Sequence, residues 1–238
     1  MKSTQLMKRS NNALNTLKIA LISSCLIVAI PTQVKAASIN ILNHSFEGPE
    51  APLAFNREFF TTNIDDWTVN SNAAVVFNPT ASQNNTGLNT YFSQSLPDGL
   101  QTLAISSGDI SQELAVTLQA NTKYTLGVFV GRRNNVSFSG YNIELLAGNT
   151  VLASNNSITP APGTFTKENV YYTSSDNDPL IGQSLGIRLS SDGIQTNFDN
   201  VTLEATAVPE PLTILGAVTA ISFGTIFKRK VAKDKPKK

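Results

Sequence analysis

Hydrophobic and polar residues alternate with a period of two along much of the middle of the chain. The segments TKYTLGVFV (122–130), GYNIELLAG (140–148) and SLGIRLSS (184–191) place apolar side chains at every second position. Successive side chains of a strand point to opposite faces, so this spacing predicts half-buried β-strands. No segment of 38–207 sustains a helical period.

Turn-rich segments such as NPTASQNNTG and SSDNDP separate these stretches and predict nine or ten short strands. Short strands at this spacing, without a long linker, predict one all-β domain over 38–207, an antiparallel jelly-roll sandwich. The expected strands are 38–42, 67–77, 101–105, 110–117, 122–131, 140–147, 150–154, 164–173, 184–190 and 196–205.

The first 36 residues have the pattern of a secretory signal peptide. Basic residues precede the apolar run Ile19–Ile30, and small residues follow it. We expect signal peptidase to remove residues 1–36 by cutting at Ala36 or Ala37. A retained anchor is the alternative, but twelve apolar residues are few for spanning a bilayer of about 30 Å.

The other end of the chain predicts a second membrane element. The apolar run 212–227 would span about 24 Å as a helix, and Lys228, Arg229 and Lys230 follow it directly. This basic cluster predicts a membrane stop with the tail in the cytoplasm and the domain outside. A permanent C-terminal anchor and a core helix are the alternatives.

Charge and rare residues exclude several functions. Between Ser38 and Pro211 the chain has six basic and sixteen acidic residues, which argues against binding nucleic acid through phosphates. The only cysteine, Cys25, lies in the predicted signal, and His44 is the only histidine. A Ser-His-Asp hydrolase, a Cys-His protease and a zinc site of His and Cys are therefore disfavoured.

Two acidic residues are candidates for a structural calcium site. Asp199 follows the alternation of Val201 and Leu203, and Glu47 follows that of the apolar residues before it. Both carboxylates are therefore expected to point inward, where an unpaired charge is costly. If the first and last strands are neighbours, Glu47 and Asp199 could bind calcium together with backbone carbonyls. The alternative is that they cap turns or contact solvent.

Aromatic residues and paired acids leave a glycan-related role open. Trp67 is the only tryptophan, and Tyr91, Phe92 and Tyr141 are further candidates for stacking on sugars. The alternative for Trp67 is a core position, which is more usual for a lone tryptophan in a sandwich. The acidic residues are scattered singly apart from Asp65 and Asp66 and the segment DND at 176–178, and these exceptions leave a two-carboxylate glycosidase as a formal alternative. Acids in surface turns are the other interpretation.

The residues Val208, Pro209, Glu210 and Pro211, followed by the apolar run and the basic cluster, resemble the PEP-CTERM sorting signal, here spanning 208–230. The segment FDNV at 198–201 commonly accompanies that signal. The resemblance implies that an exosortase cuts near the tripeptide and releases the domain to the cell surface or the extracellular polysaccharide matrix.

The domain itself resembles, more loosely, jelly-roll domains similar to carbohydrate-binding modules. The segment NHSFE at 43–47 resembles their opening NGSFE, with His44 in place of glycine, and IDDW at 64–67 resembles a following PGW. In such modules acids near the first and last strands hold a structural calcium. The resemblance therefore supports Glu47 and Asp199 as ligands and extracellular polysaccharide as a partner.

Together these observations predict an exported, non-enzymatic protein, sorted by an exosortase and able to bind glycans. Two alternatives stay open: a secreted glycan-acting hydrolase that uses carboxylates, and a structural or adhesive matrix protein.

Overall fold

The computed structural model of the protein describes residues 35–51, 59–70, 74–79 and 91–209. Contacts within the chain divide it into two units, and all of the described residues belong to the unit Thr32–Ala217. That described part contains no helix long and apolar enough to cross a membrane.

The predictions for the chain ends fall mainly on residues outside these ranges. Most of the signal peptide, Glu210, Pro211, the apolar run 212–227 and the basic cluster after it are not described. The predicted cleavage site lies where the first strand begins, with Ala36 and Ala37 both exposed. Cleavage there stays a prediction.

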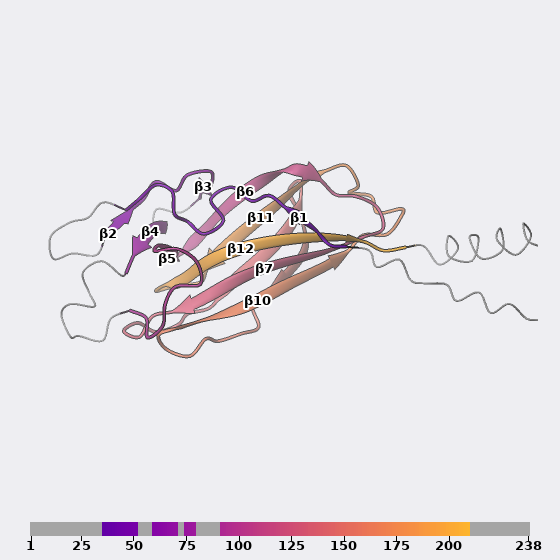
Figure 1. Cartoon of the computed structure of the whole chain (residues 1–238). Helices are drawn as coiled ribbons and strands as arrows, with labels where there is room; N and C mark the ends of the chain where they lie inside the picture. Colours follow the sequence, from indigo (N-terminus) through magenta and orange to yellow (C-terminus); the bar gives the residue numbers. More distant parts are fainter. Residues whose placement is uncertain (1–34, 52–58, 71–73, 80–90, 210–238) are drawn as a thin grey trace, which may run out of the picture. The chain divides into compact units, whose positions relative to one another are not determined.

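Twelve antiparallel strands build two sheets in the described part of the chain. The strands are β1 (Ala37–Ile39), β2 (Phe59–Thr61), β3 (Thr68–Val69), β4 (Ala74–Asn78), β5 (Thr102–Ile105), β6 (Gly108–Thr117), β7 (Thr122–Arg132), β8 (Tyr141–Ala147), β9 (Thr150–Asn155), β10 (Thr164–Thr173), β11 (Ser184–Ser191) and β12 (Thr196–Ala207). The larger sheet has the order β10-β7-β12-β5-β4-β2, and β1 also pairs with β12. The smaller sheet has the order β3-β6-β11-β8-β9. Figure 1 shows β7, β10 and β12 side by side in the larger sheet.

The core lies between the two sheets, where every second residue of the facing strands is buried. Leu126 and Val128 of β7 contribute to the same apolar cluster as Ile143 of β8 and Leu189 of β11, and all four are fully buried. Each such side chain stabilises the fold by about 1.5–3 kcal/mol through removal from water. Trp67 joins this core and packs on Phe46, with ring centroids 5.4 Å apart.

The predicted all-β antiparallel sandwich is therefore confirmed, while its jelly-roll connectivity stays a prediction. Most expected strands are present within a few residues. The expected strand 67–77 instead forms two strands in different sheets, β3 and β4. The short strand β2 was not predicted, because three residues are too few to show an alternation.

A β-bulge in β12 determines which side chains reach the outer face of the larger sheet, the face turned away from the core. Phe198 and Val201 both point into the core although they are three positions apart. The register with β7 shifts between Asp199 and Thr202, and Asn200 has a positive φ of 45°. Side chains before the bulge therefore alternate out of phase with those after it. Asp199 lies opposite Phe129 and points to the outer face, not to the core as its alternation with Val201 predicted.

Candidate active site

Two pairs of aromatic rings pack on the outer face of the larger sheet. The first, which we call the Phe77 pair, joins Phe77 of β4 to Tyr91 in the loop before β5, with centroids 4.9 Å apart in an edge-to-face arrangement. The second, the Phe165 pair, joins Phe165 of β10 to Phe92, with centroids 4.7 Å apart. Because Tyr91 and Phe92 are adjacent in sequence, one loop contributes one ring to each pair.

The backbone under the Phe165 pair must be glycine. Gly131 of β7 lies directly opposite Phe165 in the β-ladder. A Cβ added to Gly131 would lie 2.4 Å from Cε1 of the Phe165 ring, closer than Cβ contacts normally allow. The missing side chain therefore lets the aromatic ring lie close over the strand.

Asn197 lies between the two ring pairs. In the ladders of β12 it is opposite Ala104, which packs with the Phe77 pair, and opposite Gly131, which lies under Phe165. Its side chain is fully buried, and its Nδ2 donates to the carbonyl oxygen of Leu103 at 3.2 Å. Its Oδ1 has no hydrogen-bond partner among the described residues. A buried acceptor of this kind costs about 1–3 kcal/mol unless a ligand or water pairs with it.

Arg133 fixes the Phe77 pair from the end of β7. Its guanidinium carbon lies 3.6 Å from the centre of the Tyr91 ring, a cation–π contact. Nη1 donates to Gln195 Oε1 at 2.6 Å and Nε donates to Asn135 Oδ1 at 3.0 Å. The backbone N–H of Asn134 also donates to the Tyr91 carbonyl at 2.9 Å. These contacts fix the Tyr91 ring of the Phe77 pair and hold the Arg133 guanidinium over it.

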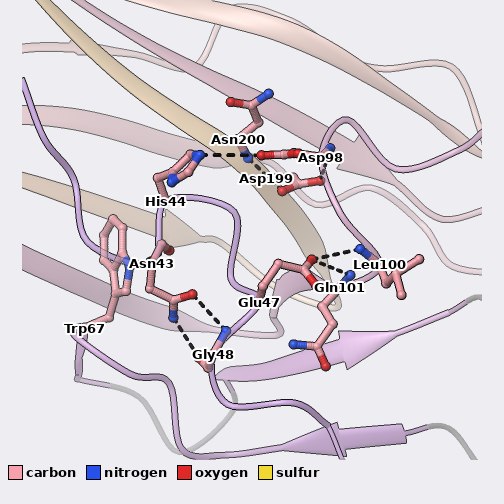
Figure 2. A network of polar contacts seen from close by, with 10 residues as sticks. All are labelled: Asn43, His44, Glu47, Gly48, Trp67, Asp98, Leu100, Gln101, Asp199 and Asn200. Carbon is pink, nitrogen blue, oxygen red and sulfur yellow. Dashed lines mark hydrogen bonds and ion pairs between the residues drawn. The ribbon is translucent and has the colours of Figure 1, made fainter. Parts of the chain in front are cut away.

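A polar network surrounds Asp199 on the same strand (Figure 2). Its side chain is fully buried. Oδ2 accepts from the N–H of Asp98 at 3.2 Å, and Oδ1 accepts from the N–H of Asn200 at 2.7 Å. Burial raises the pKa of Asp199 to about 8, the two backbone N–H groups oppose this rise, and the charges of Asp98 and Glu47 add to it.

Glu47 binds the loop that runs past Asp199. Its Oε1 accepts from the N–H of Leu100 at 2.9 Å and from that of Gln101 at 2.8 Å. Gly99 in this loop has a φ of +61°, and a Cβ there would lie 2.2 Å from the same oxygen. Glu47 is exposed, so the prediction that it points into the core is wrong, because a turn over residues 42–45 breaks the strand alternation before it.

The replacement of glycine by His44 has little effect on the backbone. The positive φ angles of this turn occur at Asn43 (47°) and Phe46 (58°), not at His44. His44 Nε2 lies 3.4 Å from Asp98 Oδ2 as a partly exposed pair. The structure therefore brings His44, Glu47, Asp98 and Asp199 to one place, as Figure 2 shows.

Glu47 and Asp199 fit a calcium site in part. Their charges are close enough for the carboxylate of Glu47 to raise the pKa of Asp199, which is the arrangement that a cation would stabilise. Within the described ranges no three His, Cys, Asp or Glu side chains form a metal-binding group. A calcium at this place would therefore need backbone carbonyls or water as its remaining ligands.

The other predicted site residues have different surroundings. Val208 donates its N–H to the carbonyl of Asn121 at 2.7 Å, and its side chain and Pro209 are exposed. Tyr141 is fully buried in the core and donates to Glu168, so it cannot stack on a sugar. The sequence did not identify Asn197 or Arg133. A polar residue within a strand, or a basic residue just after a strand, is usually exposed to solvent and gives no sign of a binding site.

Solved structures with a similar fold include cyclases that were crystallised with small molecules. The chain is similar to a Stig cyclase, Fisc from Fischerella sp. TAU, in complex with (3Z)-3-(1-methyl-2-pyrrolidinylidene)-3H-indole, at 26% identity and a TM-score of 0.63 over 74% of this chain and 100% of that one. It is also similar to a cyclase from Fischerella sp. TAU in complex with 4-(1H-indol-3-yl)butan-2-one, at 25% identity and a TM-score of 0.61 over 73% and 100% of the two chains. A search of curated proteins finds no match.

The sequence model of the HpiC1 cyclase matches residues 37–204, well over half of the chain. This match overturns the assignment to PEP-CTERM cargo and, with it, the expectation of a non-enzymatic, glycan-binding protein sorted by an exosortase to exopolysaccharide. The short motif at 208–211 lies beyond the matched domain and carries no information about the chemistry of that domain. The chain belongs to the HpiC1-like cyclase family.

Proposed function

We propose that this protein is a cyclase that binds an indole-bearing small molecule on the outer face of the larger sheet, between the Phe77 pair and the Phe165 pair. Membership of a cyclase family is the observation that carries the proposal. The two similar cyclases from Fischerella were solved with indole compounds, which supports the choice of ligand class.

The outer face has the properties that such a ligand requires. Phe77, Tyr91 and Phe165 are nearly buried in the free protein. Once the loop that carries Tyr91 and Phe92 moves, these rings provide flat apolar surfaces on which an indole can stack or pack edge to face. Closing a ring within one molecule requires the chain of that molecule to be held folded, with its reacting carbons close together. Apolar walls also exclude water, which would otherwise react with an activated intermediate.

The test is a conversion assay with indoles that carry an unsaturated side chain. We expect a product of unchanged mass and altered retention and ultraviolet spectrum, because cyclisation rearranges bonds without adding atoms. Tyr91→Ala removes a ring from the Phe77 pair and should lower kcat/KM by about tenfold or more. Tyr171→Ala, on β10 of the same sheet and largely exposed, should leave kcat/KM unchanged. A folded protein that converts no member of the panel would contradict the proposal.

We also infer that Glu47 and Asp199 hold a structural calcium ion. Calcium prefers oxygen ligands and tolerates a mixture of carboxylates, backbone carbonyls and water. Both oxygens of Asp199 accept backbone N–H groups, a pattern that suits the ionised carboxylate. A bound cation would keep the Asp199 carboxylate ionised, whereas the raised pKa of about 8 lets the ion-free group keep its proton at neutral pH. The bound ion would fix the 98–101 loop against β12, near the loop residues that carry the rings.

Export through residues 1–36 is proposed on the signal-peptide pattern alone. A family domain that begins at residue 37 is compatible with cleavage at Ala36 or Ala37.

A further inference from the structure

Asn197 is the one fully buried amide at the centre of the proposed binding face in the described part of the chain. Its ladder partners place it between the two ring pairs. Its neighbours across the ladder, Ala104 and Gly131, have small or no side chains. Ala104 packs with Phe77 and Tyr91, and the atoms nearest to Gly131 on this face belong to the Phe165 ring.

The orientation of the Asn197 amide is determined by its surroundings. A carbonyl oxygen only accepts hydrogen bonds, so the amide group that faces the Leu103 carbonyl must be the NH₂ group. Its Oδ1 therefore points elsewhere, and it is buried without a donor among the residues that the structure describes. The Asn197 side chain thus presents a fixed, unpaired acceptor.

An unpaired acceptor beside aromatic rings selects a particular kind of ligand. The ligand must be flat and apolar, so that it fits the rings, and must present one N–H in its plane. Indole has these properties, whereas benzothiophene has the same shape without the donor. Resting on the proposed function, we propose that Asn197 accepts a hydrogen bond from the indole N–H of the substrate and thereby sets both its orientation and the specificity for an unsubstituted nitrogen.

Access to Asn197 requires the rings above it to move. Asn197 is fully buried, and Phe77 and Tyr91 are nearly so. The loop that carries Tyr91 and Phe92 is held by backbone bonds from Asn134 to Tyr91 and from Ser93 to Gly163, of 2.9 and 2.8 Å. An entering indole would displace these rings and then pair its N–H with Asn197 Oδ1.

The test measures binding of two probes by calorimetry: 4-(1H-indol-3-yl)butan-2-one and its 1-benzothiophene analogue. Wild-type protein should bind the indole about tenfold more tightly, because only the indole pairs with Oδ1. Asn197→Leu should lose that preference by weakening indole binding alone. Asn169→Leu, also on the outer face but in β10 opposite Gly127, should keep it.

A second measurement separates a binding role from a structural one. Asn197→Leu removes the unpaired Oδ1 together with the bond from Nδ2 to the Leu103 carbonyl, so its melting temperature should lie within about 5 °C of that of wild type. A loss well beyond the contribution of the single Nδ2 bond would mean that Oδ1 also has a partner in the folded chain, and this would overturn the inference.

The two hypotheses fail in different ways. Equal affinity of wild type for the two probes, or a preference that survives in Asn197→Leu, would overturn the role of Asn197 and leave the proposed function standing. Failure of wild type to bind either probe would overturn the proposed function and, with it, the inference.

Discussion

Asn197 and Asp199 lie two positions apart on β12, about 7 Å along the strand, yet their surroundings differ. Asn197 has rings on both sides and an unpaired oxygen. Asp199 has backbone N–H groups on both oxygens and two further carboxylates nearby. Sequence alternation alone could not separate these roles. It predicted correctly that Asp199 is buried, but it assigned the side chain to the wrong face of the sheet. The extra residue of a β-bulge shifts the alternation by one position, and the spacing of apolar residues does not reveal it.

Asp199 should make the calcium-free protein less stable as pH rises. Its pKa is raised to about 8 in the folded protein, against an ordinary value of 3.8. The folded state therefore keeps a proton that the unfolded state releases. The stabilisation is complete below about pH 4 and is lost as pH rises towards 8. With EGTA present, we expect the melting temperature to fall by about 5 °C or more between pH 5 and 8.

Calcium should oppose this loss, because it binds the ionised form of Asp199. Adding millimolar calcium should raise the melting temperature more at pH 8 than at pH 5. Asp199→Asn should remove most of both dependences, whereas Asp176→Asn, in the loop between β10 and β11, should remove neither. If calcium does not change the melting temperature of the wild type at pH 8, the assignment of Glu47 and Asp199 as calcium ligands is wrong.

At the scale of elements, the period-two pattern was sufficient to predict most strands but not the binding face. The inner faces of β7, β8 and β11 show their alternation because the core requires apolar side chains at every second position. The binding face takes residues from β4, β7, β10, β12 and one loop, which are far apart in the sequence. No local sequence pattern indicates that Phe77, Tyr91 and Phe165 share a surface. The order of the strands in the sheet brings these residues together.

Gly131 gives a test of this arrangement at the level of one strand. Gly131→Ala would push its Cβ into the Phe165 ring and force the Phe165 pair to move. We expect a loss of about 1–2 kcal/mol in the free energy of unfolding, measured with urea, together with weaker binding of indole probes. Gly186→Ala, in β11 of the smaller sheet, is the matched control because its nearest neighbour would be 3.5 Å away. Equal stability of both variants would show that the ring does not lie over Gly131.

At the scale of the whole molecule, the two sheets form a stable support, and the proposed chemistry takes place on one outer face. The sequence predicted the support, an antiparallel sandwich over 38–207, because burial imposes its pattern on every strand. It did not predict an enzyme. The absence of cysteine from 38–207 and the single histidine excluded only nucleophilic and zinc chemistry, whereas cyclisation on an aromatic surface requires neither.

The outer face of the larger sheet is the proposed binding site for the indole substrate. The most direct measurement is a crystal structure of the protein with 4-(1H-indol-3-yl)butan-2-one. We expect the indole ring to lie between the Phe77 pair and the Phe165 pair, with its nitrogen within hydrogen-bond distance of Asn197 Oδ1. An indole bound instead on the smaller sheet, such as in the polar groove lined by Ser111, Glu113 and Arg188, would contradict it.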